Sequence, residues 1–246
     1  MKKKGLAKKT HTPLRILAIG AHPDDVEFCC AGTLARCIER GDQVTIAFAC
    51  NGSSASMDRS PEEIVKIRRR EASNAARFLG ADLIQMGLLD FGVDVNMQTK
   101  QLFADTIRQA APDVILTHFH TDYGSDHNNT FVLVRDAALA ATVGNFRTSR
   151  PAVSKSPLIY MFEPLAGYGF QPEVYVDITD SWSTKVKMLN CHKSQREWFL
   201  RRGGMDVSDY MEVVARFRGY QSGVKLAEGF VPLKNWANIA TGSILP

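Results

Sequence analysis

The sequence predicts an α/β domain built on a mostly parallel sheet with helices on both faces. Two observations carry this prediction. In the first half of the chain, apolar stretches of strand length alternate with longer stretches in which apolar residues recur at helical spacing. Two further apolar stretches of strand length follow in the second half. Strands and helices that alternate in this way form a parallel sheet covered by helices, and ligands bind at the carboxyl ends of its strands.

The individual elements follow from the apolar runs and from residues that start or stop helices. Ser60 and Pro61 are typical of a helix start, and Gly41 and Gly80 are typical of a helix end. Residues 144–156 carry no apolar period and predict a loop. The predicted strands are residues 14–20, 43–50, 82–86, 113–117, 158–163 and 173–178, and the predicted helices are residues 26–40, 61–79, 98–110, 129–141 and 180–198.

The composition is that of an ordinary globular protein. The chain has 246 residues, which suits one domain, and a formal net charge of +4. Five lysines close to its start account for this charge, and the rest is near neutral, so we expect no nucleic-acid binding. We expect residues 1–12 to form a basic flexible tail and residues 13–246 to form a single domain.

Location and partners are predicted from what the sequence lacks. No stretch approaches the roughly 20 apolar residues of a membrane span, so we expect none. The five cysteines form no C-x-x-C pair, which indicates neither a disulfide framework nor a thiolate metal site. We therefore expect a cytoplasmic protein. The sequence leaves the oligomeric state open, a homo-oligomer included.

Histidines and aspartates gather directly after the first and fourth predicted strands. Because the carboxyl ends of parallel strands meet at one edge of the sheet, the two groups can share a site. Histidine and carboxylate side chains are ligands of catalytic zinc sites, which keep a position open for water. The first group is His22, Asp24 and Asp25 in AHPDDVE, and the second is His118, His120, Asp126 and His127 in THFHTDYGSDHNNT.

The spacing H-x-x-D predicts metal binding by His22 and Asp25, with Asp24 left to act on the water. Adjacent carboxylates repel each other, and a bound cation offsets that repulsion. Helix capping by the two aspartates is the alternative, but it gives no reason for the histidines. A dinucleotide site is disfavoured because GAHPDD lacks the G-x-G-x-x-G glycines, and a serine hydrolase because no G-x-S-x-G occurs.

Five segments spread over residues 14–230 resemble one family. They are AHPDDVEFCCAGTLA, IRRREASNAARFLGAD, SDHNNT, DITDSWSTKVKMLNCHKSQ and RFRGYQSGVKLAEGF. All five are similar to motifs of the PIG-L/LmbE-like zinc-dependent N-deacetylases. The resemblance implies a Rossmann-like fold and removal of the N-acetyl group from an acetamido sugar or sugar conjugate.

Carried over residue by residue, the resemblance implies that His22, Asp25 and His127 bind Zn²⁺ or another divalent transition metal. Asp24 matches the general base, which takes a proton from the water activated by zinc and returns it to the departing amine. Asp126 matches the aspartate of the ligand loop, and it is the second residue that we assign to catalysis. A catalytically weak protein that binds sugar or metal, and an amidase for a larger sugar-conjugate amide, are the alternatives.

The resemblance also implies substrate contacts, and it contains one departure. Arg68 matches a position near the substrate, with a solvated helix face as the alternative, and Asp90 lies in a loop that binds sugar hydroxyls. The ligand loop of the family reads H-x-D-H, and its first histidine stabilises the oxyanion. Gly124 stands at that position and has no side chain to do so. Candidates to supply the missing charge are His118, His120 and His192, of which His120 and His192 are predicted substrate contacts. Trp182, Trp198 and Tyr168 could stack on a sugar ring, but we expect them to pack in the core, which is the commoner role of aromatic residues.

Overall fold

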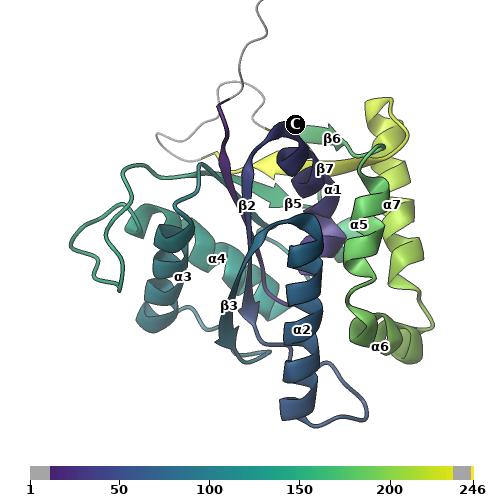
Figure 1. Ribbon diagram of the computed structural model, residues 1–246, viewed down its shortest axis with the longest axis horizontal. Helices are drawn as coiled ribbons and strands as arrows, with labels where there is room; N and C mark the ends of the chain where they lie inside the picture. Colours follow the sequence, from purple (N-terminus) through teal and green to yellow (C-terminus); the bar gives the residue numbers. More distant parts are fainter. Residues whose placement is uncertain (1–11, 235–244) are drawn as a thin grey trace, which may run out of the picture.

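The computed structural model describes residues 12–234 and 245–246, and its elements surround one seven-stranded sheet (Figure 1). The predicted tail therefore lies outside the described residues except for residue 12. The strands are β1 (Arg15–Gly20), β2 (Gln43–Cys50), β3 (Asp82–Leu88), β4 (Val114–His118), β5 (Leu158–Phe162), β6 (Val174–Asp177) and β7 (Ala227–Pro232). The helices are α1 (Asp25–Arg40), α2 (Pro61–Leu79), α3 (Met97–Ala110), α4 (Ser125–Ala140), α5 (Trp182–Leu189), α6 (Lys193–Gly203) and α7 (Val207–Ser222).

The strand order of the sheet is β3-β2-β1-β4-β5-β7-β6. The strands from β3 to β5 are parallel, and β7 runs antiparallel to both of its neighbours. In register, Ile16 of β1 lies between Val44 of β2 and Val114 of β4. The chain continues from β1 to one side and reaches β4 on the other, so the loops that follow these two strands flank a crevice. The predicted mostly parallel sheet is confirmed.

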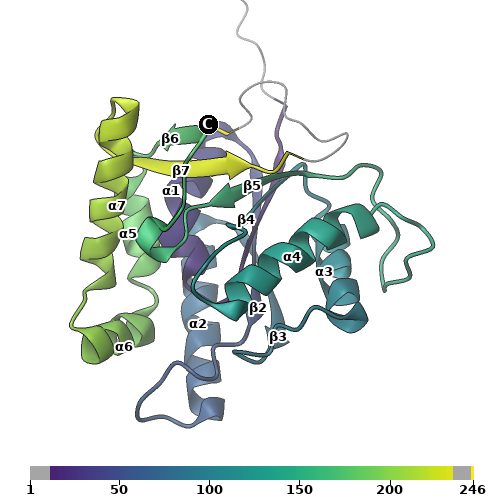
Figure 2. The same ribbon diagram turned by 180° about the vertical axis from the view of Figure 1, so that it is seen from behind.

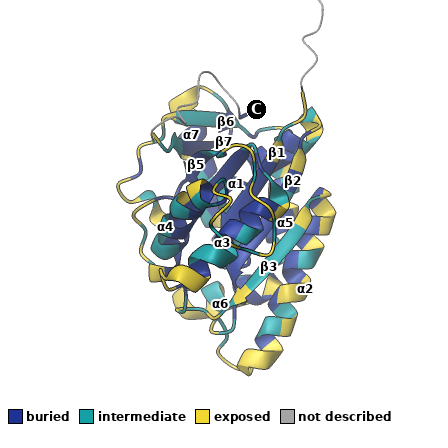
Figure 3. Cartoon of the chain, turned by 90° about the vertical axis from the view of Figure 1, so that its left-hand side faces the viewer, coloured by how far each residue is buried: buried dark blue, intermediate teal, exposed yellow. Residues whose placement is uncertain are grey.

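Alternation along the strands explains the layers. Ile16 and Ala18 of β1 face a core that includes residues of α1, α2, α5 and α7, whereas Leu17 and Ile19 face a core made with α3 and α4. Figures 1 and 2 show these two sets of helices on opposite sides of the sheet. The central strands are buried on both faces, while the outer helix surfaces are exposed (Figure 3). The predicted covering of both faces is therefore confirmed.

The predicted elements differ from the structure mainly in the second half of the chain. The helix predicted at 180–198 is wrong as one element, because the chain forms α5 and α6 with a break at residues 190–192. The buried His192 side chain lies at this break, with its Nε2 atom 3.2 Å from Glu27 Oε1 of α1. The helix predicted at 129–141 begins earlier, at Ser125. Among the helices that the structure describes, none is both long and apolar enough to cross a membrane.

Candidate active site

The turn after β1 folds back so that two predicted ligands lie together. A Cβ atom on Gly20 would lie 2.9 Å from the Asp25 Cβ, so glycine is needed where α1 begins this close to the end of β1. The backbone N–H of His22 donates to Asp25 Oδ2 at 2.7 Å. This hydrogen bond orients the Asp25 carboxylate toward the crevice rather than toward the N-terminal N–H groups of the helix.

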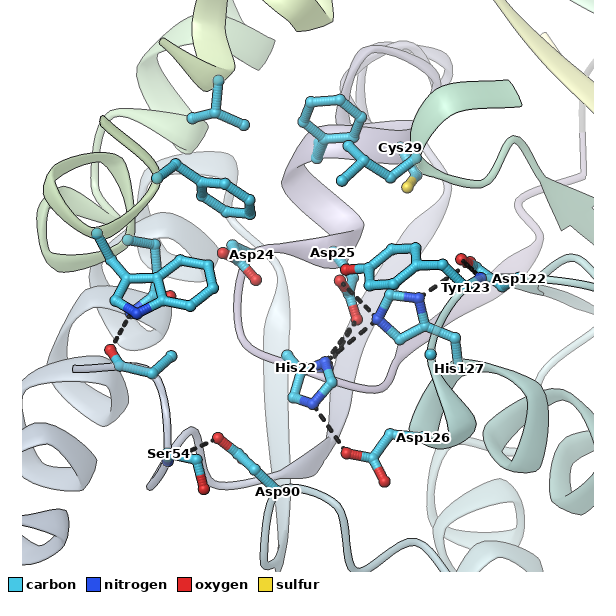
Figure 4. A pocket seen from close by; sticks show the side chains of 18 of the residues that line it. His22, Asp24, Asp25, Cys29, Ser54, Asp90, Asp122, Tyr123, Asp126 and His127 are labelled. Carbon is cyan, nitrogen blue, oxygen red and sulfur yellow. Dashed lines mark hydrogen bonds and ion pairs between the residues drawn. The ribbon is translucent and has the colours of Figure 1, made fainter. Parts of the chain in front are cut away.

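The loop after β4 brings His127 to the same place. Its Nε2 atom lies 3.2 Å from His22 Nδ1 and 3.6 Å from Asp25 Oδ1. The second Asp25 oxygen lies 3.8 Å from His22 Nδ1. Figure 4 shows the three side chains pointing toward one another. They form one of the groups in the described part of the chain whose donor atoms lie close enough to hold a metal ion.

The outer nitrogens of the two imidazoles determine what the inner nitrogens can do. His22 Nε2 lies 3.1 Å from Asp126 Oδ2, and His127 Nδ1 lies 2.9 Å from Asp122 Oδ2. A carboxylate partner favours the N–H on the outer nitrogen, which leaves a lone pair on the inner one. Two lone pairs then face each other beside the Asp25 carboxylate. This donor set fits a cation such as Zn²⁺, for which nitrogen and oxygen ligands are suited.

Electrostatics of the same residues favour positive charge. Burial lowers the pKa of His127, but the Asp25 and Asp122 carboxylates outweigh it and raise that pKa to about 9. Burial raises the pKa of Asp25, but His127 and His118 more than reverse this effect, so the pKa lies far below its usual value. Asp122 likewise has its pKa lowered to about 2 by the histidines, against the effect of burial. A metal ion can replace the proton that these carboxylates attract.

Asp24 lies beside this group but points elsewhere, as Figure 4 shows. It is the N-cap residue of α1, yet its side chain makes no capping hydrogen bond, which argues against the capping alternative for this residue. Its φ of 134° lies in the region that favours glycine, and strain of this kind is concentrated at functional sites. Burial raises its pKa to about 6, although Arg68 opposes the shift with an Nη2 atom 3.2 Å from Asp24 Oδ1. A carboxyl group with such a pKa can exchange a proton near neutral pH.

Arg68 is buried, so the solvated helix face is not what the structure shows. Besides Asp24, it donates to the carbonyl oxygen of Pro23. A Cβ atom on Gly52 would lie 2.4 Å from the Arg68 Cδ, and Gly52 has a φ of 79°. Glycine therefore lets the loop after β2 pass over the Arg68 side chain. The arginine lines the cavity from below this loop and holds the turn that carries Asp24.

Asp126 supports His22 and the loop after β3 together. Besides its contact with His22, its carboxylate accepts hydrogen bonds from the backbone N–H of Phe91 at 2.6 Å and of Val93 at 3.3 Å. These bonds hold residues 91–93 against the site. Asp126 therefore orients a predicted ligand. Gly124, two residues earlier, has an ordinary φ of −107°, and a Cβ there would lie 3.8 Å from the His127 Cγ, which is normal contact distance.

Asp90 borders the cavity, but both of its oxygens already accept hydrogen bonds. Gly52 N–H donates to Oδ1 and Ser54 N–H donates to Oδ2, each at 2.8 Å. Its visible function is to hold the loop after β2 at the rim. The predicted contact with sugar hydroxyls would have to use the remaining lone pairs.

The structure separates the three histidines named as replacements for the missing one. His118 borders the cavity, accepts a hydrogen bond from Ala21 N–H at 2.9 Å and stacks on His127 with ring centroids 4.2 Å apart. His120 is exposed and lies outside the cavity lining. His192 is fully buried against Glu27 and also lies outside that lining. Of the three, only His118 is placed next to the metal-binding group.

The cavity has a volume of about 410 Å³, which lies within the range of small-molecule sites. Polar groups line one side, among them the candidate metal ligands, Asp24 and Arg68. Trp198 also borders the cavity, whereas Trp182 and Tyr168 do not. The large apolar and aromatic lining residues besides Trp198 are Phe28, Phe91, Tyr123, Leu165, Leu189, Phe199 and Val207.

Comparison with known proteins identifies the family. The family described as PIG-L, GlcNAc-PI de-N-acetylase, matches residues 17–138, which include both groups of candidate ligands. The chain belongs to the PIG-L family. The predicted resemblance is thereby confirmed, and the region matched begins within β1 and ends within α4.

Relatives of this PIG-L family member include deacetylases and a hydratase. Diacetylchitobiose deacetylase of Thermococcus kodakarensis is 27% identical over 237 residues, covering 89% of this chain and 83% of that protein. 4-Oxalmesaconate hydratase of Pseudomonas putida is 27% identical over 226 residues, covering 87% and 84%. The structure of N,N'-diacetylchitobiose deacetylase from Pyrococcus horikoshii is 24% identical with a TM-score of 0.77, covering 89% and 83%, and this likeness shows the shared fold.

Sequence reasoning missed several residues of the site. Asp122 was not predicted, although a carboxylate in the same loop as His127 is a common partner for a metal-binding histidine. Phe91 and Tyr123 were not predicted, and no pattern in their loops distinguishes them. For Trp198 the sequence favoured packing in the core, but its side chain borders the cavity, because its position depends on how α6 packs.

Proposed function

We propose that this protein is a metal-dependent hydrolase that removes the N-acetyl group from an acetamido sugar or sugar conjugate. The observation that carries the proposal is the convergence of His22 Nδ1, His127 Nε2 and the Asp25 carboxylate, with the Asp24 carboxylate beside them. Membership of a family described by de-N-acetylation, and deacetylase relatives, support the choice of reaction.

In this proposal His22, Asp25 and His127 hold the metal, for which Zn²⁺ fits the donor set. When bound, such a metal polarises an amide carbonyl and makes water more acidic. Asp24 takes a proton from the attacking water and delivers it to the departing amine nitrogen. Arg68, at 3.2 Å from Asp24, holds that carboxylate in place and favours its ionised form. Asp126 and Asp122 keep the two imidazoles oriented.

A hydratase is the second candidate, because a hydratase relative matches as much of the chain as the deacetylase does. Gly124 also favours it, since the family position that stabilises an oxyanion has no side chain here. A hydratase adds water to a double bond, so it would release no acetate. The same Asp24 would then deliver a proton to carbon rather than to nitrogen.

Acetate release from a panel of N-acetyl sugars, with Zn²⁺ added or removed by a chelator, tests the proposal. Wild-type protein should release acetate only when the metal is present. Asp24→Asn should lower kcat by about 10²- to 10⁴-fold. Asp94→Asn is the matched control, because Asp94 is exposed and lies outside the cavity lining, and it should leave kcat unchanged. Equal rates for wild type and Asp24→Asn would sink the deacetylase, and consumption of an unsaturated acid without acetate release would favour the hydratase.

A further inference from the structure

One wall of the cavity is apolar, and three elements outside the region matched by the family build most of it. Phe28 comes from α1, whereas Leu189 closes α5, Trp198 and Phe199 come from α6, and Val207 begins α7. The rings of Trp198 and Phe199 meet edge to face, with centroids 5.0 Å apart. We refer to Phe28, Leu189, Trp198, Phe199 and Val207 as the apolar wall.

The apolar wall is held in place by packing behind it and by contacts between α6 and the loop after β2. On the protein side, Leu189 and Val207 belong to a small buried cluster, and Phe28 and Phe199 pack against it. Toward the mouth, Arg201 of α6 pairs with Asp58 at 3.0 Å, and Gln195 donates to the Ala55 carbonyl oxygen at 3.3 Å. These contacts join α6 to the loop after β2. The wall is therefore a built surface, continuous with the polar side of the same cavity.

Three polar residues line the cavity near this wall: Arg202 lies over the Trp198 ring, with its Cζ atom 4.9 Å from the ring centroid, and Gln195 and Asp90 already have hydrogen-bond partners. The Gln195 amide already donates to the Ala55 carbonyl oxygen and to Ser194 Oγ. Asp90 has both oxygens occupied by backbone N–H groups. A sugar hydroxyl pressed against the side chains of Phe28, Leu189, Phe199 and Val207 would lose water and gain no hydrogen bond from them, which is unfavourable. An apolar group of the same size would gain from leaving water.

We propose that the substrate is an amide conjugate with an apolar substituent, and that the apolar wall holds this substituent while Asp24 faces the amide. This inference rests on the proposed deacetylation and narrows its substrate class from any acetamido sugar to conjugates with an apolar substituent. Trp198 and Phe199 are then residues that determine specificity.

Two pairs of probes test the inference: the methyl and phenyl glycosides of N-acetylglucosamine, each as α and β anomer. Kinetics of acetate release should give a kcat/KM for a phenyl glycoside on the order of tenfold or more above that for its methyl partner. Trp198→Ala and Phe199→Ala should bring this ratio close to one. Leu200→Ala should keep it, because Leu200 is the next residue of α6, is 55% exposed and lies outside the cavity lining.

A phenyl-to-methyl ratio near one in the wild type would overturn the inference, as would a ratio that survives both wall variants with their thermal unfolding unchanged. A second measurement separates this failure from failure of the proposed function. Calorimetric binding of phenyl and methyl glucosides, which carry no amide, requires no turnover. If no acetate is released but the phenyl glucoside binds more tightly to the wild type than to Phe199→Ala, the wall holds apolar groups and the deacetylase proposal is wrong.

Discussion

The two parts of the chain contribute differently to one cavity. The part up to α4 supplies the candidate metal ligands, Asp24 and Arg68, all on loops that leave the parallel strands or on the helices next to them. The part from β5 onward supplies most of the apolar wall through α5, α6 and α7, and this part packs against Phe28 of α1. Chemistry and selectivity can therefore change separately, which is consistent with relatives that include a deacetylase and a hydratase.

The largest expected effect comes from removing a candidate metal ligand in the part of the chain up to α4. His127→Ala should remove the metal and abolish turnover, because it deletes one of the three inward-facing donors. Metal content measured by atomic spectroscopy after dialysis is the readout. The loss of metal affinity should exceed the tenfold to hundredfold that follows when a residue supporting a ligand is lost.

His120→Ala is the matched control for this prediction. His120 lies in the loop between β4 and α4, but its Nδ1 atom contacts Thr121 Oγ1 at 2.9 Å and it lies outside the cavity lining. We expect it to keep the metal. Equal metal content in the His127→Ala and His120→Ala proteins would show that the ion is held elsewhere.

A second prediction concerns the buried ion pair that connects the two parts of the chain. Lys185 of α5 donates to the Glu228 carboxylate of β7 and, at 2.6 Å, to the Phe28 carbonyl oxygen in α1. Glu228 in turn accepts from the N–H groups of Gly32 and Thr33, also in α1. The pair therefore connects α5 and β7 to α1, the helix that begins at Asp25. Removing one partner of a buried ion pair costs about 3–5 kcal/mol, so Lys185→Met should lower the free energy of unfolding by that amount.

Urea denaturation measures this change, and an exposed pair provides the control. Arg216 and Glu212 form such a pair along α7, and Arg216→Met should cost less than about 1 kcal/mol. If Lys185→Met cost no more than Arg216→Met, the two parts would be held together by apolar packing alone.

The sequence predicts well the features that depend on neighbouring residues, and less well those that depend on contacts between distant parts of the chain. The helix from Pro61 to Leu79 was predicted to the residue, because its signals are local: Ser60 and Glu63 form a capping box and Gly80 ends the helix with a positive φ. The break in the helix predicted at 180–198 was missed, since it depends on the burial of His192 against Glu27, far away in the sequence. Ligand spacing is similarly local, whereas the apolar wall depends on how separate helices pack.

A third prediction concerns Gly124→His, which places at this position the histidine that the ligand loop of the family has. Its φ is ordinary and a Cβ there would meet only the His127 ring at normal distance, so Gly124→His should fold. An added imidazole near the ligands can stabilise an oxyanion, and we expect acetate release to rise by up to about a hundredfold, or about 2.7 kcal/mol. Steady-state kinetics of acetate release is the measurement.

Gly124→Leu separates this electrostatic effect from the effect of filling space. It adds bulk without a hydrogen-bond donor, so we expect it to give no increase in kcat. If Gly124→His were no faster than Gly124→Leu, another group, with His118 the nearest histidine, would already supply the charge, or the reaction would be one that needs no oxyanion partner.

The smallest expected effect concerns the stability of the site loop rather than its chemistry. Phe91 has a φ of 63°, is 82% exposed and is held by its N–H bond to Asp126. A residue with a side chain is strained by roughly 1–2 kcal/mol at such a φ, and glycine is not. Replacement by glycine removes this strain, but part of the gain is lost because glycine has more conformational freedom in the unfolded chain. Phe91→Gly should therefore raise the free energy of unfolding, on the order of 1 kcal/mol, which corresponds to about 2–4 °C in Tm.

Phe91→Ala is the control for this prediction. It keeps the Cβ atom and therefore the strain, while both variants remove the aromatic ring from the cavity. A higher Tm for Phe91→Gly than for Phe91→Ala, with equal losses in kcat/KM, would show that the chain accepts backbone strain to present an aromatic ring at the mouth of the cavity; equal Tm values would contradict this.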